Sequence, residues 1–243
     1  MLKKMIRNIV LGEKASSERF VNFLRKQGVK IGDQVRFYSP NHSLVDISCP
    51  SLLTIGNNVS FTHGVIILTH DYSWSVIKQL EDSEGVILGA QSPVVIGNNV
   101  FVGVNTVITR GVTIGDNVVI GAGSVVTSDC ESNSVYAGNP ARKIMTIEQY
   151  RAKRRGKQFE EASVLVGEYR NRHGSNPPAD VLSEYLMLFS SPEEASANPV
   201  LRRQMETGGN YDACYRYMEE HKSLYENYEA FLEACSSGMG RCL

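Results

Sequence analysis

Residues 111–129 read GVTIGDNVVIGAGSVVTSD, and an isoleucine or valine leads every sixth position of this stretch. The same period extends toward the N-terminus in two runs, one from Ile31 to Ile67 and one from Ile96 onward. The step from Ile67 to Ile96 is 29 residues, so the two runs are out of register with each other. The first residues of the hexads are Ile31, Phe37, Ser43, Cys49, Ile55, Phe61, Ile67, Ile96, Val102, Ile108, Ile114, Ile120 and Val126. All but Ser43 are apolar, and a glycine follows six of them, as in the IGNN tetrapeptides at 55–58 and 96–99.

A strict six-residue period excludes the two commonest amphipathic patterns. The apolar stripe of an α-helix repeats every 3.6 residues or so, and a hairpin protein shows alternation that is interrupted at intervals of about 8–12 residues. A hexad with one inward-facing residue on a short strand, followed by a turn, is typical of a β-solenoid. We therefore predict a solenoid. The period does not fix its handedness, because parallel crossovers are right-handed in nearly all proteins.

Two segments beside the hexads have a different character. A helix is expected at 16–27, where Gly28 ends an apolar face, and such a helix can cover the open end of a solenoid. The 29-residue step is not a multiple of six, so residues 71–90 are predicted to form an inserted loop that leaves the solenoid and rejoins it. Long loops on rigid scaffolds often carry function.

The period stops after Asn139-Pro140. Helical patterns follow at 148–172, 179–189, 193–206, 211–220 and 225–235. The chain is therefore expected to contain a helical cap at 1–30, a solenoid domain at 31–146 and a helical subdomain at 147–243.

Composition excludes several classes of protein. The 243 residues carry 25 basic and 26 acidic side chains, so the chain is not a generally basic protein held to nucleic acid by counterion release. No window approaches the roughly 18–20 apolar residues of a membrane span, and the basic opening MLKKMIRNIVLGEK lacks a signal-peptide cleavage site. The five cysteines include no CxxC pair, which argues against a disulfide framework or zinc knuckle. A soluble, cytoplasmic protein is expected.

Residues 53–144 resemble the hexapeptide-repeat acyltransferases, in the branch of maltose, galactoside and polysaccharide O-acetyltransferases. The resemblance is carried by the IGNN hexads, THDYSW at 69–74, NNVFVG at 98–103, GVTIGDNVVIGAGSVVTSD at 111–129 and AGNPARKI at 137–144. It implies a left-handed parallel β-helix with three hexads per coil, to which this chain adds a short N-terminal helix and a helical C-terminal extension. It also implies a homotrimer with active sites between subunits.

Acyl transfer to a hydroxyl group requires a base that removes the hydroxyl proton, and histidine is suited to this near neutral pH. His70 lies where the inserted loop begins, and Thr69-His70-Asp71 matches the catalytic histidine of the family. The resemblance therefore implies that His70 is the general base.

Further residues are candidates for binding the acceptor. Related sugar acetyltransferases place an asparagine and an aspartate near Asn41, His42 and Asp46, where they contact the acceptor or orient the histidine. The alternative for Asp46 is a turn former. His63 stands third in its hexad and is expected to point outward, either toward the same cleft or as an ordinary surface residue. Trp74, the only tryptophan, lies in the inserted loop.

The resemblance also implies where acetyl-CoA binds. Its pantetheine would lie along the late coils, near backbone groups of Val104 and Ala122 and beside Thr127 and Ser128. Arg142, assisted by Lys143, would meet the nucleotide phosphates, a role that suits a guanidinium. The basic run RAKRRGK at 151–157 is interpreted as a solvated helix face, with contact to a coenzyme A phosphate or an anionic polymer as the alternative.

No metal is expected. A catalytic zinc needs three protein ligands, and the spacings of 21 and 7 residues among His42, His63 and His70 differ from those of the zinc-binding β-helix family.

The favoured function is an acetyl-CoA-dependent O-acetyltransferase that acts on a sugar or surface polysaccharide. An amino-sugar N-acetyltransferase, a xenobiotic acetyltransferase and a non-catalytic solenoid scaffold are the alternatives. A histidine at the loop, together with the NPARK motif at 139–143, argues against a bare scaffold.

Overall fold

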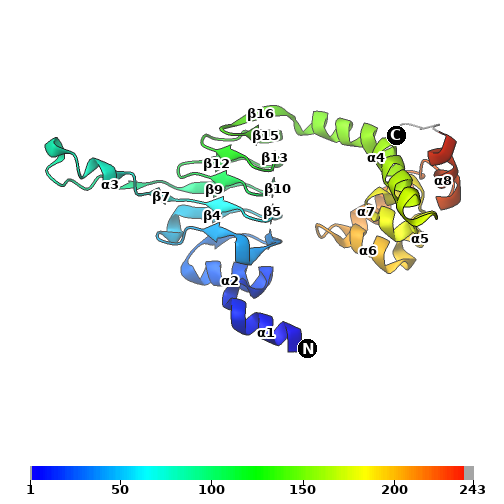
Figure 1. Ribbon diagram of the computed structural model, residues 1–243, viewed down its shortest axis with the longest axis horizontal. Helices are drawn as coiled ribbons and strands as arrows, with labels where there is room; N and C mark the ends of the chain where they lie inside the picture. The colour runs from blue at the N-terminus through cyan, green and yellow to red at the C-terminus, as the bar shows by residue number, and fades with distance from the viewer. Residues whose placement is uncertain (1, 238–243) are drawn as a thin grey trace. The chain divides into compact units, whose positions relative to one another are not determined.

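The computed structural model describes residues 2–237. The chain divides into two units, Met1–Tyr150 and Arg151–Leu243. Figure 1 labels many of the helices and strands.

Short parallel strands build three sheets in the first unit. The first sheet runs β1 (Lys30–Ile31), β4 (Leu53–Ile55), β9 (Val94–Ile96) and β12 (Thr113–Ile114). The second runs β2 (Arg36–Phe37), β5 (Val59–Phe61), β10 (Val100–Val102), β13 (Val118–Ile120), β15 (Ser134–Gly138) and β16 (Ala141–Thr146). The third runs β3 (Leu44–Val45), β6 (Ile66–Ile67), β11 (Val107–Ile108) and β14 (Val125–Val126). The chain thus passes through the three sheets in the same order four times, which confirms the expected parallel arrangement. Within these three sheets of the described residues, only β16 runs antiparallel to its neighbour. Each pass is called a coil below.

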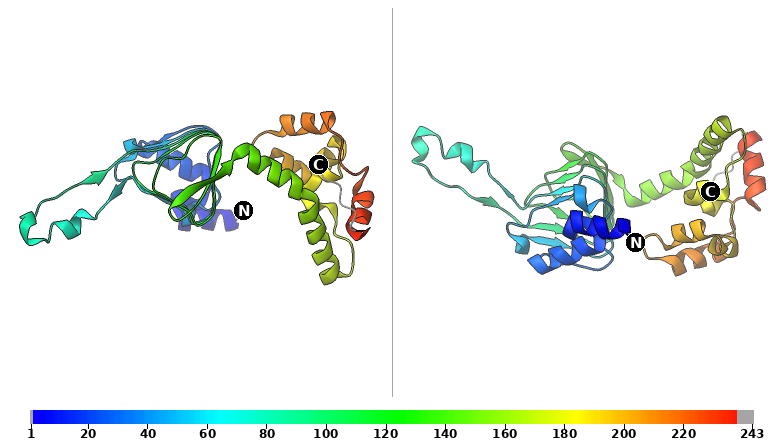
Figure 2. Two further views of the ribbon diagram at one scale, coloured as in Figure 1. Left: turned by 90° about the horizontal axis from the view of Figure 1, so that it is seen from above. Right: turned by 60° about the horizontal axis from the view of Figure 1, so that its bottom comes forward.

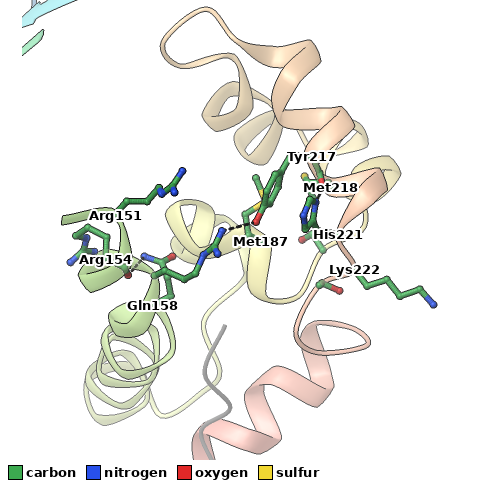
Figure 3. A pocket seen from close by; sticks show the side chains of 11 residues that line it. Arg151, Arg154, Gln158, Met187, Tyr217, Met218, His221 and Lys222 are labelled. Carbon is green, nitrogen blue, oxygen red and sulfur yellow. Dashed lines mark hydrogen bonds between the residues drawn. The ribbon is translucent and has the colours of Figure 1, made fainter. Parts of the chain in front are cut away.

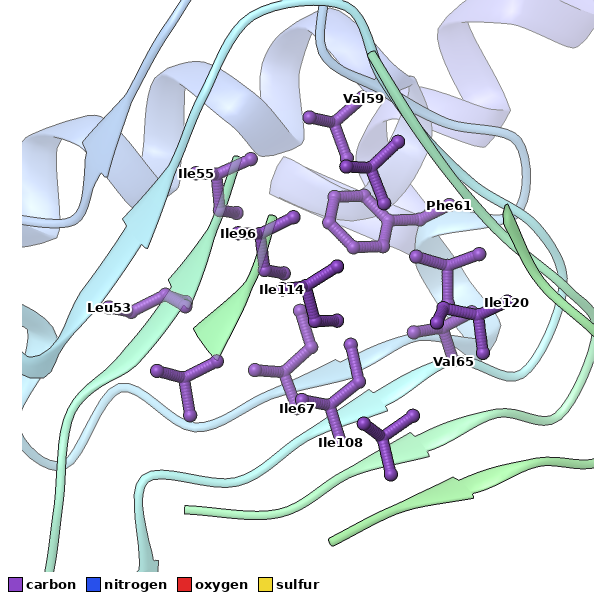
Figure 4. Close-up of a cluster of buried hydrophobic side chains, with 14 of the residues drawn as sticks. Leu53, Ile55, Val59, Phe61, Val65, Ile67, Ile96, Ile108, Ile114 and Ile120 are labelled. Carbon is purple, nitrogen blue, oxygen red and sulfur yellow. The ribbon is translucent and has the colours of Figure 1, made fainter. Parts of the chain in front are cut away.

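The first residues of the hexads face the interior, as predicted. Eleven of the thirteen are buried, and Ile31 and Cys49 are half-buried. The strand register stacks them coil on coil, with Ile96 beside both Ile55 and Ile114, and Figure 4 shows the resulting column of branched side chains. Burying each such side chain contributes about 1.5–3 kcal/mol. The stacked interior therefore supplies much of the stability of this unit.

A ladder of asparagines follows the first sheet. Asn58, Asn99, Asn117 and Asn133 all adopt the left-handed backbone conformation, with φ between 52° and 58°. The side-chain amide of each of the first three donates to the next, at 2.8–2.9 Å. Asparagine tolerates this backbone conformation better than most residues, which explains the last residue of the IGNN and IGDN motifs.

Helices cover the first coil. The predicted helix is present as α2 (Ser17–Gln27), which begins at the Ser16 cap and ends at Gly28. Its Phe20 ring packs edge-on against Phe37, with centroids 5.0 Å apart. A further helix that the sequence pattern did not indicate, α1 (Leu2–Leu11), precedes it, followed by the 3-10 turn η1 (Gly12–Ala15). Two more 3-10 turns, η2 (Pro40–His42) and η3 (Pro50–Leu52), lie within the early coils.

The inserted loop forms an arm that leaves the sheets and returns, as Figure 2 shows. Its base is a two-stranded antiparallel ribbon of β7 (His70–Asp71) and β8 (Ala90–Gln91). Between them lie α3 (Trp74–Ile77) and the 3-10 turn η4 (Glu81–Ser83). We call residues 72–89 the arm.

The second unit is helical. It contains α4 (Ile147–His173) from Arg151 onward, η5 (Ala179–Leu188), α5 (Pro192–Ala197), α6 (Pro199–Glu206), α7 (Tyr211–Glu220) and α8 (Tyr228–Ser237). Its main core joins Ala162 and Val166 of α4 to Phe189 and Phe231. Among the helices of residues 2–237, none is both long and apolar enough to cross a membrane.

Two helix predictions in this unit need correction. The single helix expected at 193–206 is wrong, because Pro199 starts a new helix whose first amides, at Val200 and Leu201, are capped by Asn198 Oδ1 at 2.8 and 3.2 Å. Residues 179–188 form a 3-10 helix with a kink at Leu182 rather than an α-helix.

Candidate active site

His70 stands at the base of the arm, where the chain leaves the third sheet. It pairs with Gln91 across the β7–β8 ribbon. Beside it, the Ser92 amide donates to the Thr69 carbonyl at 3.0 Å. Pairing with β8 therefore holds the backbone of His70, although the arm beyond is long.

The carboxylate of Asp46 lies against His70. Asp46 follows β3, and its amide donates to the Ile67 carbonyl of the next coil at 2.9 Å. This stacking brings Asp46 Oδ2 to three donors: the Thr69 amide at 2.9 Å, the Thr69 hydroxyl, and His70 Nδ1. The other oxygen accepts from the amide and hydroxyl of Ser48, at 2.9 and 2.7 Å.

This network keeps Asp46 ionised. The Asp46 side chain is only 5% exposed, and burial by itself raises the pKa of a carboxyl group. The hydrogen bonds from Thr69 and Ser48 outweigh the burial and hold the pKa of Asp46 well below its usual range. A buried negative charge therefore lies beside the imidazole at neutral pH.

The arrangement orients the His70 ring. Because the Asp46 carboxylate can only accept, the imidazole proton sits on Nδ1 and the lone pair is on Nε2. The Tyr72 ring packs edge-on to the imidazole, with centroids 4.7 Å apart. The His70 side chain remains 18% exposed. A histidine held in this way can accept a proton at Nε2, and the carboxylate stabilises the imidazolium that results.

An ion pair also fastens the same corner. Arg110 follows β11, and its Nε donates to Asp71 Oδ2 at 2.5 Å. The hydroxyl of Ser73 also donates to Asp71, at 2.6 Å. The Ser73 hydroxyl and the Arg110 guanidinium lower the pKa of Asp71 to about 2. The base of the arm is thereby tied to the following coil.

The other predicted acceptor residues lie elsewhere, except Trp74. Asn41, His42 and His63 are exposed in turns that lead from the second sheet to the third, and the two imidazole rings are 4.4 Å apart. His70 and Asp46 lie at the opposite end of the strands of the third sheet. Trp74 begins α3 in the arm, with its ring 6.1 Å from that of Tyr72.

The residues expected to hold coenzyme A fall into three places. Val104 and Ala122 occupy turns of successive coils that are equivalent to the turn of His63, an expected acceptor residue; the Asn105 amide donates to the His63 carbonyl, and the Gly123 amide to the Val104 carbonyl. Thr127 and Ser128 are exposed after β14, and Arg142 is exposed on β16. Lys143, its neighbour, forms an ion pair with Glu131 at 2.7 Å, which raises the pKa of the ammonium group.

Three residues of the site were not singled out in the sequence. Thr69 is fully buried beside His70, and the match to THD already contained it. Ser48 stands two residues after Asp46, a spacing typical of an aspartate that caps its own turn. Arg110 carries no sequence signal that indicates its pairing with Asp71, because 39 residues separate them.

Potential metal ligands are dispersed among the described side chains. Within residues 2–237, no three histidine, cysteine, aspartate or glutamate side chains gather in a way that could hold a metal ion.

One family of repeat sequences and one curated protein are similar to parts of this chain. The family described as "Hexapeptide repeat of succinyl-transferase" matches residues 93–128. Protein CapG of Staphylococcus aureus is 47% identical over 131 residues, which cover 54% of this chain and 73% of CapG.

Solved structures also match this chain. A maltose O-acetyltransferase from Clostridium difficile is 30% identical with a TM-score of 0.39, and the match covers 59% of this chain and 81% of that one. For a galactoside acetyltransferase in complex with coenzyme A, the identity is 27%, the TM-score 0.40 and the two coverages 60% and 81%.

The network around Asp46 predicts a pH-dependent loss of stability in Asp46→Asn. The amide retains the shape of the carboxylate but places an NH2 group among donors, so the free energy of unfolding at pH 7 should fall by about 1.5–3 kcal/mol. Because the folded-state pKa is lowered, the stabilisation is complete above the ordinary value of 3.8 and is lost as the pH falls below it. Urea unfolding from pH 7 to pH 3 should therefore show the gap to wild type narrowing below about pH 4.

The matched control is Asp33→Asn, since the Asp33 side chain is 93% exposed. It should change stability by less than about 0.5 kcal/mol. A pH-independent gap for Asp46→Asn would contradict the assignment of an ionised, hydrogen-bonded carboxylate.

Proposed function

This chain belongs to the hexapeptide-repeat family of acyltransferases, and we propose that it transfers an acetyl group from acetyl-CoA to a hydroxyl group of a sugar or surface polysaccharide. The observation that carries the proposal is the contact of His70 Nδ1 with the buried carboxylate of Asp46. The proposal includes left-handed winding of the coils, the three segments 1–30, 31–146 and 147–243, and a cytoplasmic location.

In the proposed reaction, His70 acts as the general base. Its Nε2 accepts the proton of the acceptor hydroxyl while that oxygen forms a bond to the acetyl carbon. Asp46 holds Nδ1–H and balances the positive charge that develops on the ring. As the bond from carbon to sulfur breaks, the imidazolium returns the proton to the leaving thiolate, so the base is regenerated.

The buried carboxylate beside His70 favours a hydroxyl acceptor over an amine. An amine is already nucleophilic and needs a base only to collect a proton, whereas a hydroxyl must lose its proton as it attacks. Burying the Asp46 carboxylate costs desolvation free energy, and five hydrogen-bond donors are needed to offset it. A histidine that only collects a proton from an amine does not need such a partner. This supports O-acetylation.

Residues of the later coils fit the donor. Acetyl-CoA supplies the acetyl group as a thioester. The backbones at Val104 and Ala122 would line the pantetheine, and both residues are exposed. Thr127 and Ser128 offer hydroxyl groups, and Arg142 an exposed guanidinium, to the nucleotide. Lys143 would assist only in part, because Glu131 already balances its charge.

We propose a homotrimer in which an adjacent subunit completes the site. Asn41, His42 and His63 would then face the arm of a neighbour, with Trp74 contacting the acceptor. The exposed apolar side chains of the arm support this. Val76 is 70% and Ile87 61% exposed, and clusters of such residues mark interaction surfaces.

His70→Ala should lower kcat by roughly a hundredfold to ten-thousandfold, because it removes a proton transfer made in the transition state. Donor binding should persist, since other coils hold the donor. Release of free thiol from acetyl-CoA, measured with a panel of sugars, checks this. His173→Ala, a change to an exposed histidine of the second unit, is the control and should retain full activity. A near-normal kcat for His70→Ala would move the base to another residue.

Arg142→Ala should raise the KM for acetyl-CoA by about tenfold or more, since a charge-assisted hydrogen bond to phosphate contributes roughly 1.5–3 kcal/mol. The kcat at saturating donor should change much less. Arg172→Ala, which removes another exposed arginine, serves as the control. An unchanged KM for Arg142→Ala would exclude the phosphate contact.

Ile87→Asp should weaken the trimer, because it places a charge in the apolar surface of the arm. Light scattering should report a trimer for wild type and smaller species for the variant, with activity falling in parallel. Val164→Asp adds the same charge at an equally exposed valine of α4 and should leave the trimer intact. A fully active wild-type monomer would contradict the proposal.

A further inference from the structure

A cavity of about 430 Å³ lies within the second unit, between residues 151–158 of α4 and the end of α7. Figure 3 shows Arg151 and Arg154 on one side and Tyr217 and His221 on the other, with Met187 between them. Nothing in the proposed transfer reaction uses it. Its volume lies in the range of sites for small molecules, roughly 300–1,000 Å³. A long polymer would instead need an extended groove.

The cavity is lined by positive charge. Arg151, Arg154 and Arg155 project from α4, and none of the lining residues is acidic. Lys222 also lines the cavity, but its side chain extends away from it in Figure 3. Arg154 is engaged by Glu161 through two hydrogen bonds of 2.7 and 2.6 Å. Among the ion pairs of residues 2–237, none includes Arg151, Arg155 or Lys222. Arg151 and Arg155, two arginines of one cavity that lie outside these ion pairs, favour an anion, above all one with more than one negative charge.

One of these cations is held in place by the opposite wall. Arg155 Nη2 donates to the phenol oxygen of Tyr217 at 3.1 Å across 62 residues of sequence. The guanidinium is thereby positioned, and its other N–H groups remain for a ligand, since arginine has five donors. A positioned arginine binds phosphate more tightly than a mobile one, because less side-chain freedom is lost on binding.

The remaining wall is apolar and flat. Tyr217 and His221 stack on one another, with centroids 4.2 Å apart and planes 11° apart. Met187 and the buried Met218 lie beside them. Thioethers and aromatic faces bind planar organic groups well. The cavity therefore presents a cationic side and an aromatic side to the same ligand.

We propose that this cavity binds a small organic phosphate, one that joins a phosphate or diphosphate to a planar ring, as a nucleoside diphosphate does. The phosphate lies on Arg151 and Arg155, and the ring lies against Tyr217 and Met218. The helical subdomain is then a ligand-binding module in addition to the transferase unit.

Isothermal titration calorimetry on the full chain tests this with UDP, inorganic pyrophosphate and uridine as probes. UDP should bind one-to-one, and uridine and pyrophosphate each more weakly, because each lacks half of the recognised chemistry. Arg151→Gln/Arg155→Gln should weaken UDP binding by about a hundredfold, since each lost charge-assisted contact costs about a factor of ten or more. These side chains are exposed, and far-ultraviolet circular dichroism should show an unchanged fold.

Two control variants distinguish binding in this cavity from binding elsewhere on the chain. Lys153→Gln/Arg172→Gln removes the same charge from α4 outside the cavity and should leave UDP affinity unchanged. Arg142→Ala alters the proposed donor site and should also leave it unchanged, so that failure of either proposal is seen independently.

Four results would overturn the inference. The first is an absence of UDP binding, and the second is an equal loss in both double variants, which would indicate non-specific charge attraction. The third is loss of UDP binding only in Arg142→Ala, which would place UDP in the donor site. Pyrophosphate or uridine binding as tightly as UDP would likewise overturn the assignment to an organic phosphate.

Discussion

Close stacking of one coil on the next is the constraint on which the first unit depends. A Cβ on Gly56 would lie 2.6 Å from the Gly97 carbonyl oxygen, and one on Gly97 would lie 2.8 Å from the Gly115 carbonyl carbon. At this spacing, each coil has room for one branched side chain per hexad, and successive isoleucines meet in the interior. A period that slipped by one residue would turn these side chains outward.

The same stacking builds the chemistry of the candidate site. Asp46 and Thr69 follow strands of the third sheet in successive coils, so parallel register alone brings the carboxylate under the Thr69 amide. The insertion then interrupts the period directly after the buried threonine. It turns the chain outward at His70, and the β7–β8 ribbon fixes that turn. A rigid repeat thereby positions an irregular segment, which is how loops on regular scaffolds come to carry function.

The second unit is held together by helix packing rather than by a sequence repeat. Its helices are short and joined by prolines and glycines, and their packing rests on aromatic side chains such as Phe189 and Phe231, 5.2 Å apart. No repeat sets the positions of its surface residues. The basic run at 151–157 therefore distributes its charges by helical geometry, and only some of them turn toward α7. Most of this run is exposed, as expected of a solvated face, while Arg154 is half-buried and pairs with Glu161, and the exposed Arg155 donates to Tyr217.

The six-residue period by itself determined the parallel sheets, the inward residues such as Ile96 and Ile114, and the place of the insertion, because each depends on local spacing along the chain. It likewise singled out His70, which stands where the period breaks. The family resemblance indicated Asp46 as a residue that contacts the acceptor or orients this histidine, and the tertiary structure decided between the two roles. It alone showed the contact of Asp46 with His70 and that of Arg110 with Asp71, because 24 and 39 residues separate these partners and no local pattern encodes which side chains meet across a coil. The cavity between α4 and α7 could not be predicted from the sequence for the same reason. Its walls come from segments about 60 residues apart, and only the packing of the helices brings their side chains together around one cavity.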